Sequence, residues 1–253
     1  MKSDIRVFRN LKEISRNAAT IFVEQSAKAI QERGHFLAVL NGGSTPEGTF
    51  RLLATEYREI VDWSYVHLFW GDERCVPPDD PGSSYGQALD LFLRHVQIPE
   101  SNIHPIKGEL SPEAAASDYI EVLKAYATSP LEWPRFDLVF LGMGEDGHTA
   151  SLFPGSPIPE SGPVVSVTAH YQDRPARRVS LTPSVFNSAR RVVFMAAGEK
   201  KSATLAEVLS GRYNPELYPV QRVDPKDGKL IWLVDEDAAS KLPVELVRKF
   251  CEG

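Results

Sequence analysis

Short apolar runs alternate with longer stretches of helical period through most of the chain. The apolar runs cover residues 36–40, 66–70, 136–141, 164–168, 179–181, 192–196 and 230–234. The helical stretches cover residues 11–32, 46–57, 86–95, 112–127, 201–209 and 238–250. Several apolar runs lack polar alternation, which is typical of strands covered on both faces. This order predicts an α/β fold with a mainly parallel, Rossmann-like sheet, helices on both faces and a single domain over residues 1–253.

Capping residues and prolines mark where several of these elements begin and end. Thr45 and Ser111 are candidate N-caps, because each precedes a proline and then a glutamate. The proline-rich stretches 154–163 and 214–228 cannot continue a helix or a central strand, so we expect loops there. Proline and glycine content does not establish motion, and we therefore expect loop 154–163 to be fixed rather than a closing lid.

The composition limits the classes of partner. The formal net charge is -6 over 253 residues, which argues against a surface that collects nucleic acid or anionic lipid. No apolar run approaches the roughly 18 residues that span a bilayer, and the first residues lack the apolar core of a secretory signal. Cys75 and Cys251 have no metal-binding or redox spacing. We expect a cytoplasmic protein without nucleic-acid or membrane partners, disulfide or metal.

Ligands of parallel α/β sheets bind at the carboxyl ends of the strands, so residues that follow apolar runs are the candidates for function. The first such segment, residues 41–46, contains Gly42, Gly43, Ser44 and Thr45 directly before a helix. Glycines let backbone N–H groups approach an anion, the hydroxyls add donors, and a helix N-terminus attracts negative charge. The segment is therefore interpreted as a phosphate cradle, with a tight turn as the alternative.

The second segment, residues 71–74, closes the next apolar run with three consecutive charged side chains. Arg74 has a planar guanidinium suited to phosphate, and Asp72 could orient a base or a sugar hydroxyl. A short charged run can also be a solvated turn. Its position at a strand end favours function.

The third segment is a glycine-rich turn after the run at 136–141. Gly142, Gly144 and Gly147 fit the dinucleotide pattern G-x-G-x-x-G. That pattern should open a long helix, but prolines stand at 154 and 157. It should also be followed, about 20 residues on, by an acidic residue at the end of a strand, and none is found there. A nicotinamide enzyme is therefore rejected.

His148 ends the same turn, with Asp146 two residues before it. A histidine in this place could be a structural group or a metal ligand, but no second histidine lies at metal spacing. We interpret His148 as a general base.

A fourth segment, at 198–203, places Lys201 in the first turn of a helix. A cation is unfavourable there because of the helix dipole, which suggests an anionic ligand; solvated lysines are the alternative. Upstream, the Arg177–Arg178 pair enters an apolar run, where a buried guanidinium needs a carboxylate or phosphate. Arg178 and Lys201 are therefore further candidate phosphate ligands.

Taken together, these segments resemble the 6-phosphogluconolactonase family over nearly the whole chain. The motifs are residues 144–154, 42–46, 71–74 with Val76 and Pro77, and Gly198 with Lys201. The resemblance implies hydrolysis of 6-phospho-D-glucono-1,5-lactone in the oxidative pentose phosphate pathway, without metal or cofactor. It also implies that His148 is the base and that Arg74 and Lys201 hold the phosphate. Asn41 stands where serine is commoner in the family.

Two alternatives remain beside the lactonase. Glucosamine-6-phosphate deaminases share the glycine loop and the Asp-Gly-His turn, but they carry Asn-Glu-Pro after the histidine, where this chain has Leu152, Phe153 and Pro154. They also prefer tyrosine at the position of Arg74. A sugar-phosphate sensor without turnover is the other alternative, although no helix-turn-helix or basic arm is evident.

Lactone hydrolysis needs an activated water, a stabilised oxyanion and a proton for the leaving ring oxygen. We expect His148 to carry out both proton transfers, oriented by Asp146 or Asp72. Backbone N–H groups of the turn, with Gly144 and Gly147 as candidates, would stabilise the oxyanion. Functional coupling to glucose-6-phosphate dehydrogenase, which produces the lactone, is a further expectation.

Overall fold

A parallel sheet of eight strands forms the centre of the protein. The structure is a computed structural model that describes residues 4–159, 161–171 and 174–249. The strand order is β11-β1-β10-β9-β6-β2-β3-β5, and neighbouring strands are parallel. The strands are β1 (Asp4–Phe8), β2 (Phe36–Leu40), β3 (Val66–Trp70), β5 (Ile103–His104), β6 (Leu138–Gly142), β9 (Arg191–Ala196), β10 (Lys229–Asp235) and β11 (Arg248–Lys249). The predicted α/β class with a mainly parallel sheet is confirmed.

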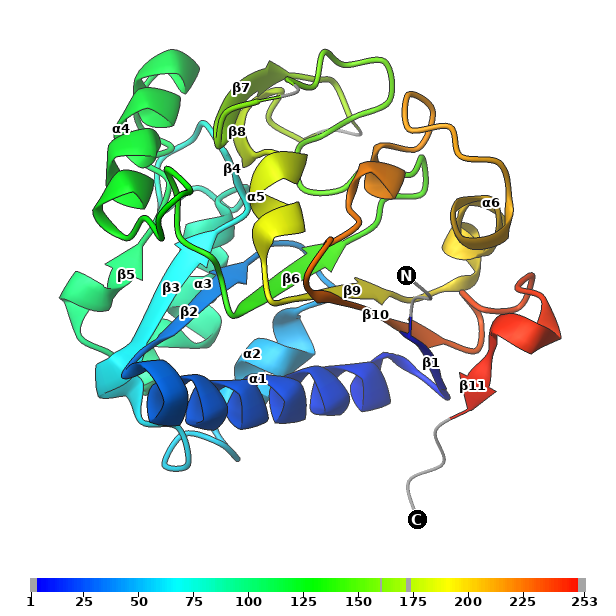
Figure 1. The fold of residues 1–253 in the computed structure, drawn as a ribbon, viewed down its shortest axis with the longest axis horizontal. Helices are drawn as coiled ribbons and strands as arrows, with labels where there is room; N and C mark the ends of the chain where they lie inside the picture. Colours follow the sequence, from blue (N-terminus) through cyan, green and yellow to red (C-terminus); the bar gives the residue numbers. More distant parts are fainter. Residues whose placement is uncertain (1–3, 160, 172–173, 250–253) are drawn as a thin grey trace.

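Helices cover both faces of this sheet. They are α1 (Leu11–Arg33), α2 (Glu47–Ala54), α3 (Ser84–Leu91), α4 (Pro112–Ala125), α5 (Pro183–Ser188) and α6 (Ser202–Ser210). Figure 1 shows α1 and α2 below the sheet and α4 and α5 above it. Every residue of β2 is buried, as expected for a strand covered on both sides. Short 3-10 helices lie at Trp63–Tyr65, Leu93–His95, Glu100–Asn102, Glu199–Lys201, Pro219–Arg222 and Val244–Leu246.

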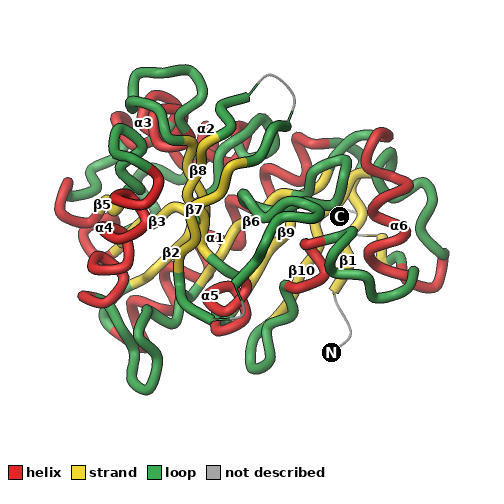
Figure 2. Tube along the Cα trace, turned by 90° about the horizontal axis from the view of Figure 1, so that it is seen from above, coloured by secondary structure: helices red, strands yellow, loops and turns green. Residues whose placement is uncertain are grey.

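A second, antiparallel sheet lies over the first. Its strands are β4 (Asp72–Arg74), β8 (Arg177–Leu181) and β7 (Val164–Thr168), in that order. Figures 1 and 2 show β7 and β8 stacked above the main sheet. The runs at 164–168 and 179–181 are thus strands, as predicted, but they do not join the parallel sheet. The chain crosses from one sheet to the other at Gly71, whose N–H donates to Leu40 O and whose carbonyl accepts from Leu181 N, both at 2.8 Å.

The prediction of a helix over residues 238–250 is wrong. Turns follow β10, a 3-10 helix covers Val244–Leu246, and β11 pairs with β1. Pro243 has no backbone N–H and prevents an α-helix from continuing through this segment. Phe250 and Cys251 lie outside the described residues.

The N-cap prediction is confirmed for Ser111 and wrong for Thr45. Ser111 Oγ accepts from Ala114 N at 3.3 Å, directly before α4. The cap of α2 is Pro46, which has helical backbone angles (φ -79°, ψ -8°) and whose carbonyl accepts from Phe50 N at 3.0 Å. Thr45 lies one residue too early to cap the helix.

Candidate active site

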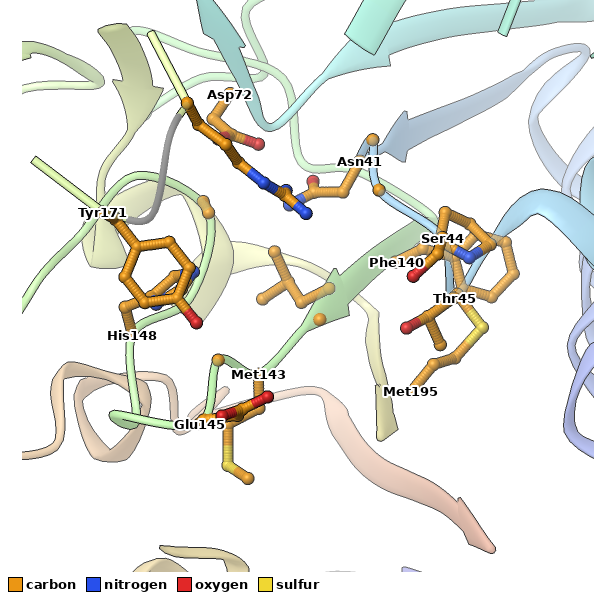
Figure 3. A pocket seen from close by; sticks show the side chains of 18 of the residues that line it. Asn41, Ser44, Thr45, Asp72, Phe140, Met143, Glu145, His148, Tyr171 and Met195 are labelled. Atoms are coloured by element: carbon orange, nitrogen blue, oxygen red, sulfur yellow. The ribbon is translucent and has the colours of Figure 1, made fainter. Parts of the chain in front are cut away.

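A cavity of about 210 Å³ opens at the carboxyl ends of β2, β6 and β9, beneath the second sheet. It brings together most of the predicted site residues. These are Gly42, Gly43, Ser44, Thr45, Asp72, Arg74, Gly144, His148, Arg178 and Lys201. Figure 3 shows His148 and Tyr171 on one side of the cavity and Ser44 and Thr45 on the other. Asp146 and Gly147 are not part of its lining.

His148 is held in place by its own turn. Its Nδ1 lies 2.5 Å from Asp146 Oδ1, which also accepts from His148 N at 3.1 Å. Burial tends to raise the pKa of Asp146, but the hydrogen bond and charge of His148 outweigh this and hold that pKa below its usual value. The imidazole packs against Phe153 and Tyr171, with ring centroids 4.5 and 4.6 Å away. Nδ1 is thus occupied, and Nε2 is the nitrogen available to a ligand.

Two glycines make this turn feasible. Gly147 has φ +84°, a conformation that favours glycine. A Cβ on Gly144 would lie 2.1 Å from His148 Nδ1, so only glycine lets the imidazole approach its carboxylate.

The oxyanion prediction for Gly144 and Gly147 is wrong. The N–H of Gly144 donates to His148 O at 2.9 Å, and the N–H of Gly147 donates to Gly144 O at 3.1 Å. Both donors close the turn around His148 and are not available to a developing oxyanion.

Asp72 has a partner other than the histidine. Its Oδ2 accepts from Ser151 Oγ at 2.7 Å, and its side chain is buried. Burial lowers the pKa of Arg178, and the negative charge of Asp72 opposes this shift without cancelling it. Of the two acids predicted to orient His148, Asp146 is therefore the one in contact with it.

Glu73, between Asp72 and Arg74, has a structural position. Its carboxylate accepts from the backbone N–H groups of Arg74, Ser84 and Tyr85 at 2.7 to 2.8 Å and from Ser83 Oγ at 3.0 Å. Burial raises its pKa, and these four hydrogen bonds oppose the rise. Glu73 thereby ties β4 to the N-terminus of α3.

Arg74 and Arg178 present unpaired donors beside the cavity. Arg74 is 9% exposed and donates from Nη1 to Gly82 O at 2.6 Å; Arg178 is 2% exposed and donates from Nε to Pro175 O at 3.0 Å. Within the described part of the chain, Arg74 Nε and Arg178 Nη2 are buried without a hydrogen-bond partner. Buried N–H groups of a cation that lack an acceptor suit an anionic ligand.

Lys201 faces the cavity, whereas its neighbour Lys200 is exposed. Burial lowers the pKa of Lys201, and the carboxylates of Glu145 and Asp235 oppose this shift. The 3-10 helix Glu199–Lys201 turns the chain between β9 and α6 and directs only one of the two lysines inward.

The glycine loop after β2 supplies backbone donors. Gly43 has φ +106°, and its N–H donates to Gln87 Oε1 at 2.9 Å. Among the described residues, the N–H groups of Ser44 and Thr45 have no protein acceptor. They lie just before α2, where the helix dipole favours an anion.

Tyr171 and Arg174 also line the cavity and were missed by the sequence reasoning. They belong to the connection between β7 and β8, which no glycine or motif marks. Their closeness in sequence to Arg178 was the one available signal.

In the described ranges, no group of three histidine, cysteine, aspartate or glutamate side chains could hold a metal ion. Cys75 is a half-buried free thiol whose pKa is raised by burial. None of the described helices is both long and apolar enough to cross a membrane.

Comparisons with known proteins match nearly the whole chain. The family model of glucosamine-6-phosphate isomerases/6-phosphogluconolactonase matches residues 9–232. A 6-phosphogluconolactonase of Synechocystis sp. is 36% identical over 244 residues, which cover 96% of this chain and 99% of that protein. The crystal structure of 6-phosphogluconolactonase from Leishmania guyanensis is 27% identical with a TM-score of 0.84, covering 96% of this chain and 100% of that one. A monomeric glucosamine-6-phosphate deaminase shares the fold, at 22% identity and a TM-score of 0.81 over 94% of this chain and 99% of that one.

Proposed function

The chain belongs to the glucosamine-6-phosphate isomerase/6-phosphogluconolactonase family, and from this premise we propose that it hydrolyses 6-phospho-D-glucono-1,5-lactone to 6-phospho-D-gluconate. One observation carries the proposal. His148, which a carboxylate orients, lines the same cavity as two guanidinium groups, and each of these has an unpaired N–H donor. The histidine suits the reacting carbonyl, and the guanidinium groups suit the phosphate.

In the proposed reaction, His148 Nε2 accepts a proton from the attacking water. The water oxygen forms a bond to C1 of the lactone, and the bond between C1 and the ring oxygen then breaks. The imidazolium returns its proton to the ring oxygen, and the new carboxylic acid releases a proton to solvent. Asp146 stabilises the imidazolium and fixes Nδ1 as the protonated nitrogen while His148 acts as the base.

Phosphate binding would position the lactone. Arg74, Arg178 and Lys201 supply positive charge, and the N–H groups of Ser44 and Thr45 supply neutral donors. Because the phosphate does not react, its binding energy serves to place C1 near His148. Asp72 and Glu145 line the same cavity and keep it from being uniformly positive.

The deaminase alternative is less well supported. Phe153 packs on the His148 ring in the segment where those enzymes are expected to carry a glutamate. The likeness to a solved deaminase extends to the fold alone. A sensor without turnover would not need the contact between Asp146 and the His148 imidazole.

We propose a cytoplasmic location and functional coupling to glucose-6-phosphate dehydrogenase. The lactone also hydrolyses unaided, so an enzyme that uses it has to act where it is formed. Depletion of this protein from cell extract should slow the conversion of glucose 6-phosphate to 6-phosphogluconate; an unchanged rate would contradict the coupling.

The decisive experiment measures acid release from freshly generated lactone at constant pH, with wild type and His148→Gln compared against the unaided rate. We expect wild type well above that rate and the variant slower by about 10²- to 10⁴-fold, because a general base contributes this much. A folded wild type at the unaided rate would contradict the proposal. Ammonia release from glucosamine 6-phosphate would then support the deaminase, and its absence the sensor.

A further inference from the structure

Thr204 connects the helix after Lys201 to the turn that carries His148. It lies in the first turn of α6, three residues after Lys201, so the two residues lie on one face of the chain. Its Oγ1 donates a hydrogen bond of 2.6 Å to Glu145 O. Glu145 and His148 belong to one turn and line the cavity together with Lys201. Thr204 thus joins the support of the proposed base to that of one proposed phosphate ligand.

The same side chain also lies near the far end of the turn. A Cβ on Gly147 would lie 3.4 Å from Thr204 Cγ2, so the methyl group of Thr204 is a close neighbour of this glycine. Val220 supports Gly147 as well, because its N–H donates to Gly147 O at 3.1 Å. Within the described part of the chain, Thr204 is the only residue whose side chain donates a hydrogen bond to a backbone carbonyl of residues 144–148. Removing its hydroxyl therefore breaks one link to the turn and leaves the backbone link at Val220 in place.

The bonds inside the turn fix His148 relative to Asp146 but not relative to Lys201. Gly144 N donates to His148 O, and Asp146 Oδ1 contacts the imidazole, so both contacts stay within residues 144–148. Lys201 stands on a separate segment, beyond β9. The distance between the base and this cation therefore depends on contacts between the two segments, and the Thr204 hydrogen bond is one of them.

We propose that Thr204 is a positioning residue that keeps His148 at the separation from Lys201 that the phosphorylated lactone requires. The phosphate and C1 belong to one small molecule, so the groups that hold them have to keep a matching distance. Thr204 does not line the cavity and acts through the turn rather than on the substrate. This inference rests on the proposed lactonase function and adds to it a residue outside the cavity.

The test compares Thr204→Val, which removes the hydroxyl and keeps the branched shape, with Thr204→Ser, which keeps the hydroxyl. We expect kcat/KM for 6-phosphogluconolactone to fall about tenfold in the valine variant, because small displacements of reacting groups are costly, and to stay within about threefold of wild type in the serine variant. Thr55→Val is the matched control, since exposed Thr55 Oγ1 donates to Arg51 O at 2.7 Å, outside the cavity. Both valine variants lose one exposed hydrogen bond and should lose about 2–4 °C in Tm. Thr55→Val should nevertheless keep the wild-type kcat/KM.

A Lys201→Met background distinguishes positioning from general support of the turn. In this background Thr204→Val should change kcat/KM by less than about twofold, because residue 201 no longer holds the phosphate. Enzyme concentrations are chosen so that each rate exceeds the unaided one. With an active wild type, a tenfold loss in both backgrounds, no loss in either, or a serine variant as slow as the valine variant would overturn the role of Thr204 alone. A folded wild type at the unaided rate would overturn the lactonase function and this inference together.

Discussion

Asp146 Oδ1 contacts both the Nδ1 and the backbone N–H of His148, at 2.5 and 3.1 Å. One carboxylate oxygen therefore fixes the ring orientation and the turn that carries the ring. A residue in this position acts through the histidine rather than on the substrate. The contribution of Asp146 to catalysis can therefore be separated by experiment from that of Arg74, Arg178 and Lys201.

Asp146→Asn should lower kcat by about 10- to 10³-fold with little change in KM, because the amide stabilises the imidazolium poorly and permits the wrong tautomer. The double variant with His148→Gln is the control. If Asp146 acts through His148, the double variant should be no slower than His148→Gln alone. Additive losses would contradict this relationship.

Arg178→Met should raise KM by about 10- to 100-fold, because hydrogen bonds to a charged group are lost from a buried site. Arg177→Met is the matched control, since Arg177 lies beside it on β8 but is exposed and outside the cavity lining. Inhibition constants for 6-phosphogluconate and for gluconate show whether the rise in KM comes from a lost phosphate contact. Arg178→Met should weaken only the phosphorylated inhibitor; equal weakening of both would exclude a phosphate contact.

Gly144→Ala should abolish most activity in a folded protein. The added Cβ would lie 2.1 Å from His148 Nδ1 and 2.6 Å from Asp146 Oδ1, so both side chains must move. A displacement of this order lowers kcat by about 100-fold. Circular dichroism should show an unchanged fold. A variant with wild-type kcat would contradict the prediction, because catalysis would then not depend on the present position of the His148 ring.

A histidine pair away from the cavity predicts acid sensitivity of the fold. His67 Nδ1 and His104 Nε2 lie 3.2 Å apart, and burial lowers the pKa of both, to about 4 for His104. Between this value and the ordinary histidine pKa of about 6.5, the unfolded chain binds more protons than the folded one. The free energy of unfolding should therefore be fully present above pH 6.5 and decrease as pH falls toward 4.

The measurement is Tm between pH 4 and 8. The His104 ring keeps part of its contact with solvent, so we expect about 1 kcal/mol, or roughly 2–4 °C in Tm, to depend on this titration. His104→Gln should flatten the profile. His95→Gln, at an exposed histidine, should leave it unchanged. A wild-type Tm that is constant from pH 6.5 to 4.5 would contradict the prediction.

Local patterns predicted the fold class and the place of the site because both depend on short-range features. The apolar runs and the glycine turns after them are visible in sequence, and they place His148 and Lys201 beside the same cavity. The assignment of strands to sheets depends on long-range pairing. β4 has three residues and pairs with β8 about a hundred positions later, which no local pattern reveals.

The hydrogen bonds inside the His148 turn were equally hidden from the sequence. Asp146 and Asp72 were equivalent candidates, and only the folded turn shows that Asp146 contacts the imidazole. The sequence also does not show that the N–H groups of Gly144 and Gly147 donate hydrogen bonds within the turn. By contrast, the sequence itself shows Pro243 in the stretch 238–250, and this proline outweighs the apolar pattern that predicts a helix there.

The proposed phosphate ligands are divided between the two sheets. His148 and Lys201 stand on segments that follow strands of the parallel sheet, whereas Asp72, Arg74 and Arg178 stand on the antiparallel one. Changes to β4 and β8 therefore alter the two arginines while Lys201 and the Ser44–Thr45 loop stay in place. An anion site divided in this way can be adjusted one sheet at a time instead of being rebuilt at once.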